Sequence, residues 1–323
     1  MKKRLLPPVL AIVVAAGIAG SASPVSAARK FLVIGGASEA GIYYQVALGV
    51  CKLVNEKLGN KGYTCIGRPS LGSVFNIKAI QRGLLNFGVA QSDRNWQAYN
   101  GEADWTRRPY EGLRSVFSIH AETVMLVARA DTGITSVDGL RGKRVNIGNP
   151  GSGHRGNAED ILRIYGIDQN RDITARGLTA QRATGAFVKD KIDAFFYTVG
   201  NPWKSGQKLA NRVKIRMIPI DAPGIKQFAA DHPYYVITAI PGGMYNGVDK
   251  DVPTYAVKAT LVTNQKESEE VVYNLVKTVF DNLDGFRKMN PAFASVQPQD
   301  MLKGLSAPLH AGAIRYYKEK GWM

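Results

Sequence analysis

Serine and glycine stand together at three points where an apolar run of the sequence gives way to a helical pattern. These points are Gly36-Ala37-Ser38, Ser70-Leu71-Gly72-Ser73 and Asn149-Pro150-Gly151-Ser152-Gly153. The start of a helix has backbone N–H groups without partners and a partial positive charge, and glycine lets a ligand approach the backbone closely. Any one of these turns can be explained as a helix cap, but three together favour binding sites for an anion.

The third turn is followed by His154 and Arg155, which fall just inside the predicted helix. An arginine guanidinium can hold a carboxylate through two parallel hydrogen bonds, so we expect Arg155 to contact an acidic ligand. The alternatives are an arginine that faces solvent and a histidine with only a structural role.

Two further polar stretches follow predicted strands. Gln91-Ser92-Asp93 come directly after the apolar run 87–90, where Asp93 either accepts a hydrogen bond from a ligand amine or hydroxyl or caps the next helix. Residues 195–202, FFYTVGNP, bring aromatic side chains next to a polar loop. Pockets for small ligands are typically lined in this way, although alternation along a strand puts at least one of the two phenylalanines into the core.

Strands and helices alternate around these turns. Short apolar runs that end near glycine are followed by helix-period segments and then by another apolar run, which is the unit of a parallel α/β sheet. The unit recurs in the strand-like runs 31–34, 62–66, 87–90 and 144–148 and in the helical patterns 43–58 and 73–81. In an open α/β sheet, ligands bind at the carboxyl ends of the strands. We therefore expect an α/β fold with doubly wound sheets.

The two longest β-rich runs, 123–129 (TVMLVAR) and 255–263 (YAVKATLVT), bracket a middle part with its own pattern of strand, glycine and helix. This bracketing predicts one lobe inserted into another, joined by two crossing strands that act as a hinge. We expect residues 28–127 and 256–323 to form lobe 1 and residues 128–255 to form lobe 2. No long linker separates the parts, so the lobes should meet closely across a cleft.

Residues 1–27 have the pattern of a secretory signal peptide. Three basic residues precede an apolar stretch at 5–18, and small residues at 24–27 offer a cleavage site. The alternative is a retained membrane anchor, for which the stretch is short. The 323-residue chain has a formal net charge of +16, and cleavage after residue 27 leaves 39 basic and 26 acidic residues, a charge of +13. The sequence therefore predicts an exported, basic protein of the periplasm.

Cys51 and Cys65 are the two cysteines of the chain. In an oxidising compartment two thiols usually pair, and no histidine stands at metal-ligand spacing from either one. We therefore expect a disulfide rather than two separately buried thiols, and no metal site. Because Cys51 falls in a predicted helix and Cys65 in the next strand, the bond would tie helix to strand, and closing a loop of about 15 residues contributes about 3 kcal/mol.

Three other functions fit the sequence less well. Residues 33–41 resemble a dinucleotide-binding turn but lack its full glycine spacing, so no cofactor is expected. The basic residues are scattered among acidic ones, which argues against nucleic acid. The run 36–40 approximates the nucleophile elbow of a hydrolase. A secreted serine hydrolase is thus the alternative function, with Ser38 as nucleophile and one of the histidines as its base: His120, His154, His232 or His310.

Six blocks of the sequence, in order, resemble those of the TAXI family of extracytoplasmic solute receptors that serve TRAP transporters. The blocks are 38–44 (SEAGIYY), 71–77 (LGSVFNI), 88–93 (GVAQSD), 149–156 (NPGSGHRG), 193–202 (DAFFYTVGNP) and 308–313 (PLHAGA). The resemblance extends over nearly the whole mature length.

This resemblance implies a type II-like periplasmic binding protein, with two α/β lobes that close on a small organic acid. The receptor would hand its ligand to TRAP membrane permease subunits driven by an ion gradient. Family ligands are glutamate-like molecules, dicarboxylates and 2-oxo acids. Such a receptor is not an enzyme, has no cofactor and is expected to be a monomer.

The turns and the resemblance together define the candidate ligand-binding residues. These are Ser38, Tyr43, Tyr44, Ser73, Asn76, Gln91, Ser92, Asp93, Ser152, His154, Arg155, Tyr197, Gly200 and Asn201. The first block departs from the family, because Glu39-Ala40-Gly41 stands where Thr-Gly-Gly is common and Ile42 where Thr is common. A carboxylate at Glu39 disfavours a ligand with two negative charges unless it points away or pairs with a ligand amine.

Overall fold

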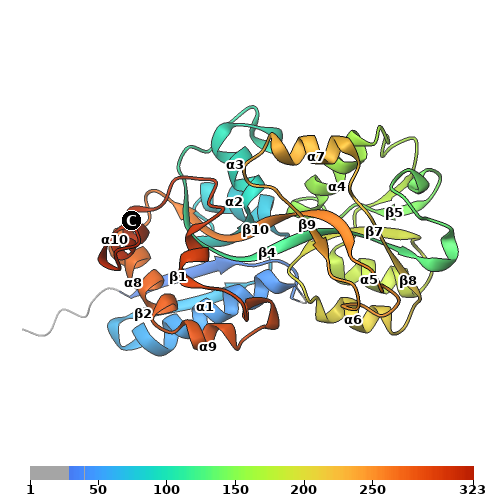
Figure 1. The fold of residues 1–323 in the computed structure, drawn as a ribbon. Coiled ribbons are helices and arrows are strands. Elements are labelled where there is room, and N and C mark those ends of the chain that lie inside the picture. Colours follow the sequence, from blue (N-terminus) through green and yellow to red (C-terminus); the bar gives the residue numbers. More distant parts are fainter. Residues whose placement is uncertain (1–28, 40) are drawn as a thin grey trace, which may run out of the picture.

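The computed structural model describes residues 29–39 and 41–323, so the predicted signal peptide at 1–27 lies outside the described residues. Within the described residues, no helix is long and apolar enough to cross a membrane. The chain folds into two α/β lobes that lie side by side (Figure 1). Lobe 1 holds the first three strands and the last three helices, and lobe 2 holds the middle of the chain. The predicted two-lobed α/β fold is confirmed.

The sheet of lobe 1 starts with three parallel strands. β1 (Lys30–Gly35) lies between β2 (Tyr63–Arg68) and β3 (Phe87–Gln91) and pairs in parallel with both. The helices that follow these strands are α1 (Ile42–Leu58), α2 (Ser73–Gln81) and α3 (Ser92–Asn100). Since each helix begins where a strand or its turn ends, the helix N-termini gather at the carboxyl edge of the sheet, as the sequence pattern predicts.

β4 (Leu113–Arg129) and β10 (Val252–Asn264) are the two crossing strands, and they pair with each other antiparallel. In lobe 1 β10 also pairs with β3, and in lobe 2 β4 pairs with β7 (Ala194–Val199). Both strands are longer than the predicted runs. With β5 (Arg144–Asn146) and β6 (Thr174–Arg176) of lobe 2, the sheet is continuous through them in the order β2-β1-β3-β10-β4-β7-β5-β6. The predicted lobe boundaries at 128 and 255 fall inside β4 and β10 and stay a prediction.

Lobe 2 repeats the alternation of strands and helices. β7 pairs in parallel with β5, which also pairs in parallel with β6. β8 (Ile215–Ile218) pairs antiparallel with β4, and β9 (Val236–Ile240) pairs antiparallel with β10. The helices are α4 (Gly153–Ile164), α5 (Ala180–Val188), α6 (Lys204–Ala210) and α7 (Pro223–Ala230).

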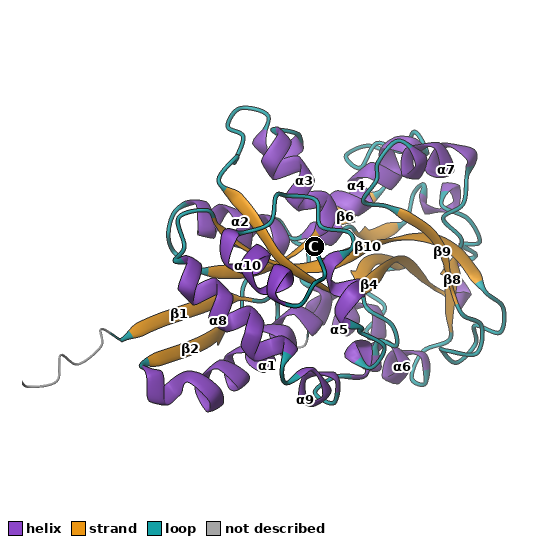
Figure 2. Cartoon of the chain, turned by 60° about the vertical axis from the view of Figure 1, so that its left-hand side comes forward, coloured by secondary structure: helices purple, strands orange, loops and turns teal. Residues whose placement is uncertain are grey.

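The C-terminal helices return to lobe 1 and cover it, with α8 packed against both α1 and α10 (Figure 2). They are α8 (Glu269–Phe280), α9 (Leu283–Arg287) and α10 (Ala311–Glu319). His310 begins the last of them: its Nδ1 accepts a hydrogen bond from the Gly312 N–H at 3.1 Å, and its Nε2 donates to the Glu267 carbonyl at 3.1 Å. The sequence block 308–313 therefore caps and anchors α10.

Cys51 of α1 and Cys65 of β2 form a disulfide, with their Cα atoms 4.8 Å apart. The predicted bond between helix and strand is confirmed. Both cysteines lie in the buried core of lobe 1. Because α1 starts at the first glycine-serine turn, the bond also fixes the helix that carries this turn against the sheet.

Candidate ligand-binding site

The second and third glycine turns meet where the two lobes meet. Asn149 Nδ2 of lobe 2 donates a hydrogen bond to the Leu71 carbonyl of lobe 1 at 3.0 Å. Gly72 has a φ of +108°, and a Cβ added there would lie 3.2 Å from the Ser152 Cα. Glycine therefore permits both this backbone conformation and the close approach of the lobes, which stand closed on each other.

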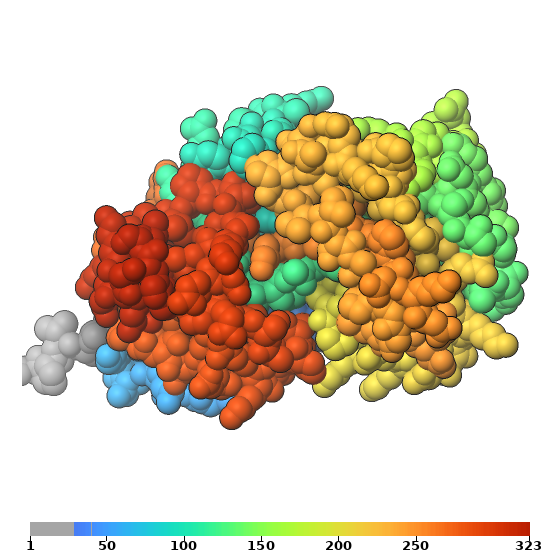
Figure 3. Space-filling model, in the orientation of Figure 1, coloured from blue at the N-terminus to red at the C-terminus, as the bar shows by residue number. Residues whose placement is uncertain are grey.

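A small cavity of about 50 Å³ lies between the lobes and is lined by residues of both. Figure 3 shows one face of the molecule, which is hollowed between the two lobes. β4 and β7 also contribute to the lining, so the cavity reaches down to the crossing strands. A space of this size suits a small molecule rather than a polymer.

The first residues of four helices line the cavity. They are Gly41 and Ile42 at α1, Gly72 and Ser73 at α2, Ser152 and Gly153 at α4, and Thr179 and Ala180 at α5. Each lobe thus provides two helix N-termini, whose first-turn N–H groups and dipoles favour a negative charge. The sequence pattern identified the first three. The fourth was missed because α5 starts without glycine.

Seven of the candidate residues line this cavity: Ser38, Tyr43, Ser73, Gln91, Ser152, His154 and Tyr197. The backbone N–H of Gln91 donates to Ser73 Oγ at 3.1 Å. The side-chain Oε1 of Gln91 is buried and has no hydrogen-bond partner among the described residues. A Cβ added to Gly153 would clash with this Oε1 and with Ser73 Oγ. Gln91 therefore presents a free acceptor where the lobes come closest.

Glu122 also lines the cavity, and the sequence analysis did not find it. It lies on β4, is 2% exposed, and its Oε2 accepts a hydrogen bond from the Tyr43 hydroxyl at 2.5 Å. His120 Nε2 stands 3.7 Å from its Oε1. Burial raises the pKa of Glu122, and the neighbouring His120 and Tyr43 oppose this shift. The sequence signal that would have found it is an acidic residue two positions after a histidine in the middle of a long β-rich run.

His154 is buried beside Tyr197, with the ring centroids 5.4 Å apart in an edge-to-face arrangement. Burial, and then the nearby Arg155 charge, lower the pKa of His154 to about 4, so this ring is neutral at pH 7. Among the described residues that line the cavity there is no lysine or arginine. Glu122 is therefore the one side chain in this lining that can carry a charge at neutral pH.

The chain matches the NMT1-like family over residues 34–321. It belongs to this family. The match does not extend to the TAXI subtype suggested by the six sequence blocks.

Solved structures share the fold of this NMT1-like protein at low identity. A putative L-cystine ABC transporter protein from Listeria monocytogenes is 14% identical with a TM-score of 0.51, over 85% of this chain and 99% of that one. A substrate-binding protein from Streptococcus pneumoniae with bound histidine is 14% identical with a TM-score of 0.51, over 84% of this chain and 94% of that one. A structure from a study of glutathione import in Streptococcus mutans is 9% identical with a TM-score of 0.53, over 84% of this chain and 100% of that one.

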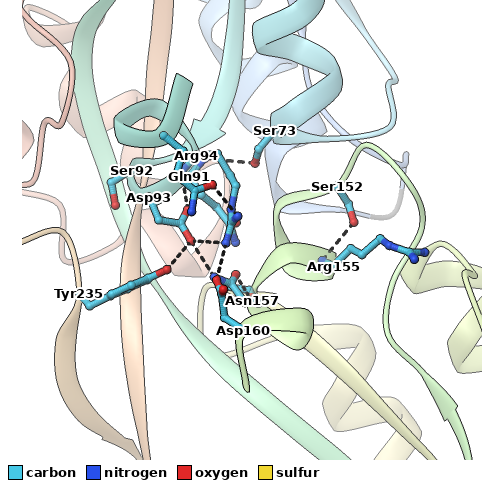
Figure 4. A network of polar contacts seen from close by, with 12 residues as sticks. Ser73, Gln91, Ser92, Asp93, Arg94, Ser152, Arg155, Asn157, Asp160 and Tyr235 are labelled. Carbon is cyan, nitrogen blue, oxygen red and sulfur yellow. Dashed lines mark hydrogen bonds and ion pairs between the residues drawn. The ribbon is translucent and has the colours of Figure 1, made fainter. Parts of the chain in front are cut away.

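In the NMT1-like protein Arg155 does not line the cavity, so the structure does not support the predicted contact with the ligand, which stays a prediction. Its Nε donates to Glu159 Oε1 at 2.9 Å, and its Nη1 donates to the Gly148 carbonyl at 3.3 Å. Its backbone N–H is capped by Ser152 Oγ at 3.3 Å, so the third turn is a helix cap as well as part of the cavity. Figure 4 shows the Arg155 side chain directed away from Gln91 and Asp93.

Asp93 is fully buried, outside the cavity lining, in a network that spans the lobes (Figure 4). Its carboxylate accepts from Arg94 of α3 at 3.0 Å, from Asn157 Nδ2 of α4 at 2.7 Å and from the Tyr235 hydroxyl at 3.2 Å. It also accepts from the Arg94 backbone N–H at 2.7 Å. Asp93 thus joins α3 to lobe 2, and the two sequence-based alternatives, a ligand contact and a helix cap, stay predictions.

The other candidate residues also lie outside the lining of the cavity. Asn76 Nδ2 donates to the Gly36 carbonyl at 2.7 Å and to the Val89 carbonyl at 2.9 Å, which fixes α2 to the sheet. Ser92 Oγ accepts from the Lys258 N–H at 3.0 Å. Three further candidates do not line the cavity either: Tyr44, Gly200 and Asn201. Glu39 is exposed, so the carboxylate near the ligand space is Glu122 and not Glu39.

Proposed function

We propose that this chain is an extracytoplasmic solute-binding receptor that captures a small organic acid between its lobes and delivers it to a membrane transporter. The observation that carries the proposal is the convergence of four helix N-termini, two from each lobe, on one small interlobe cavity. A ligand that contacts both lobes binds the closed form better than the open form, which is what a closing receptor requires.

The lining favours one carboxylate rather than a dianion. Helix N-termini near an anion contribute about 0.3–1 kcal/mol each at exposed positions, and up to about 2 kcal/mol when partly buried. Two negative charges would need further positive groups, whereas the described lining has no lysine or arginine and contains the Glu122 carboxyl. Two of the similar structures are associated with amino acids: one is a putative L-cystine ABC transporter protein and the other holds bound histidine.

The transporter that we propose is of the TRAP class, with the receptor as a TAXI-type subunit. The support is the ordered set of six sequence blocks, together with the predicted signal peptide at 1–27, which would place the receptor in the periplasm. Uptake of ligand into membrane vesicles that hold the permease, with added receptor, should follow an imposed ion gradient and proceed without ATP. A strict need for ATP would overturn this assignment.

A secreted serine hydrolase is the competing function, but the described residues of the site lack the serine–histidine arrangement that it requires. Among the described residues, no hydrogen bond joins the Ser38 hydroxyl to a histidine. The histidine in the cavity, His154, stands 3.5 Å from the Ser152 hydroxyl instead. The low pKa of His154, about 4, also makes it a poor base.

A thermal-shift screen of the mature protein against amino acids, monocarboxylates, dicarboxylates and 2-oxo acids, followed by calorimetry, tests the receptor proposal. We expect at least one organic acid to bind with one-to-one stoichiometry and to raise the melting temperature. Absence of binding across all four classes would overturn the proposal. Turnover of ester or amide substrates that is lost in Ser38→Ala would support the hydrolase in its place.

A further inference from the structure

We infer that Glu122 and Gln91 form a subsite for a protonated amine, so that the ligand of this receptor is an α-amino acid rather than a dicarboxylate or a 2-oxo acid. This inference rests on the proposed function, since it names the ligand class of the same cavity. It starts from two acceptor oxygens of the lining residues, Glu122 Oε1 and Gln91 Oε1, to which no described residue donates a hydrogen bond.

The first acceptor is the Glu122 carboxylate. Its Oε2 accepts from the Tyr43 hydroxyl at 2.5 Å, and burial together with the Glu122 charge keeps the pKa of Tyr43 high, so the phenol retains its proton. No donor of the described residues hydrogen-bonds to Oε1, because His120 Nε2, at 3.7 Å, lies beyond hydrogen-bond distance. One carboxylate oxygen is thus available to a ligand.

The second acceptor is Gln91 Oε1, which is buried and unpartnered among the described residues. Buried polar atoms usually have a hydrogen-bond partner, so an orphaned acceptor in a cavity wall indicates a donor that comes from outside the chain. Gln91 follows β3 in lobe 1, and its Oε1 lies against Gly153 of lobe 2. A donor bound here would therefore contact the receptor where Gly153 of lobe 2 packs against Gln91 of lobe 1.

The charge of the cavity decides which donor fits. A buried carboxylate is costly unless a positive group compensates it. The titratable group beside Glu122 is His120, whose Nε2 lies 3.7 Å from Glu122 Oε1, and neither lysine nor arginine lines the described part of the cavity. His154 is neutral at pH 7. An ammonium group supplies a positive charge and three N–H donors to a cavity whose lining includes both Glu122 and Gln91.

The same cavity is suited to the other end of an amino acid. The N-termini of α1, α2, α4 and α5 offer backbone donors to a carboxylate. A dicarboxylate would bring a second negative charge toward Glu122, and a 2-oxo acid would bring a carbonyl with no N–H. Only the zwitterion matches a cavity that combines helix N-termini with a buried carboxylate.

Calorimetry on matched ligands tests this inference. The probes are two series with one skeleton each: L-glutamate, 2-oxoglutarate and glutarate, and L-alanine, pyruvate and propionate. In at least one series we expect the amino acid to bind at least tenfold more tightly than its 2-oxo and deaminated partners. A 2-oxo acid that binds as tightly as its amino acid would overturn the amine subsite while the receptor function stands. No binding of any organic acid would instead overturn the proposed function.

Glu122→Gln tests whether the negative charge of Glu122 is needed for binding. The amide keeps the size of the side chain and can still donate and accept hydrogen bonds, but it carries no charge. We expect the variant to lose at least 30-fold in affinity for the amino acid and to change less than threefold for the 2-oxo partner. The control is Glu56→Gln on the exposed face of α1, which should change neither affinity. Unchanged amino-acid affinity in Glu122→Gln would overturn the inference.

A measurement on the unaltered protein keeps the test independent of the folding of that variant. The N-acetyl form of the preferred amino acid has no protonated amine but retains the carboxylate and side chain. We expect the free amino acid to bind and its N-acetyl form not to bind. The 2-hydroxy analogue, which fits the same space, should bind at least tenfold more weakly than the amino acid. Equal binding of the 2-hydroxy analogue would overturn the need for an amine.

Discussion

Arg94 of α3 reaches from lobe 1 to Asp160 of α4 in lobe 2, with its Nη2 3.3 Å from Asp160 Oδ2. The guanidinium is almost fully buried and also binds Asp93 at 3.0 Å, while a Cβ added to Gly156 of α4 would clash with it. A buried charge needs its partners, so separating the lobes at this point would expose or orphan Arg94. The contact therefore favours the closed arrangement independently of the ligand.

Asp160→Asn should shift the ligand-free receptor toward the open form. It removes the interlobe ion pair but leaves Arg94 paired with Asp93 inside lobe 1. Since apparent affinity scales with the population of the binding-competent form, we expect a three- to tenfold loss of affinity. Small-angle scattering of the ligand-free protein should show a larger radius of gyration.

The control for this variant is Asp168→Asn, which breaks an exposed ion pair with Arg171 within lobe 2. It should leave affinity and radius unchanged. If Asp160→Asn behaves like this control in both measurements, the Arg94 contact does not regulate closure.

Arg155→Ala should change ligand affinity by less than twofold. The sequence pattern predicted a direct contact between Arg155 and the ligand carboxylate, but its guanidinium binds Glu159 and the Gly148 carbonyl outside the cavity lining. Loss of this partly exposed pair should cost less than about 1 kcal/mol of stability. Calorimetry against the preferred ligand measures this change in affinity. A tenfold loss would show that Arg155 contributes to ligand binding.

Gly153→Ala should reduce ligand affinity at least tenfold with little change in the melting temperature. The new Cβ would clash with Gln91 Oε1 and Ser73 Oγ across the interlobe contact, which disfavours closure more than it disfavours the folding of either lobe. Gly185→Ala on α5 is the matched control, since no atom lies within 4 Å of its Cβ position. Equal affinities of the two variants would contradict the close approach of the lobes at Gly153.

His154 should make the folded protein less stable as the pH falls from about 6.5 toward about 4. Burial lowers the pKa of His154 in the folded state to about 4, so in this window the unfolded chain binds more protons than the folded one. Stability then decreases with falling pH, with a slope of up to about 1.4 kcal/mol per pH unit for this group. Urea unfolding at pH 7.0, 5.5 and 4.5 should show a smaller decrease for His154→Gln than for the wild type. Parallel curves would show that His154 becomes protonated in the folded state without cost.

Local patterns were sufficient for the scaffold. Periodicity and glycine placement predicted the two crossing strands and the strand-turn-helix units around Ser38, Ser73 and Ser152. The positions of the two cysteines predicted the disulfide between Cys51 and Cys65. Each strand, turn and helix is recognised from residues near one another in the chain, and the disulfide from the compartment that the signal pattern indicates. The crossing strands β4 and β10 lie far apart in the chain, and they were predicted because the two β-rich runs bracket the middle part.

The tertiary structure decided which side chains reach the ligand space. Glu122 meets Tyr43, 79 positions away, and Arg94 meets Asp160, 66 positions away. The start of α5 joins the cavity only through the packing of lobe 2 on lobe 1, and the side chain of Arg155 turns to Glu159 because a partner lies one helical turn away. The sequence by itself determined where helix N-termini would gather, because that depends on local hydrogen bonding. Which charges line the cavity depends on the closure of two lobes, and only the folded chain sets it.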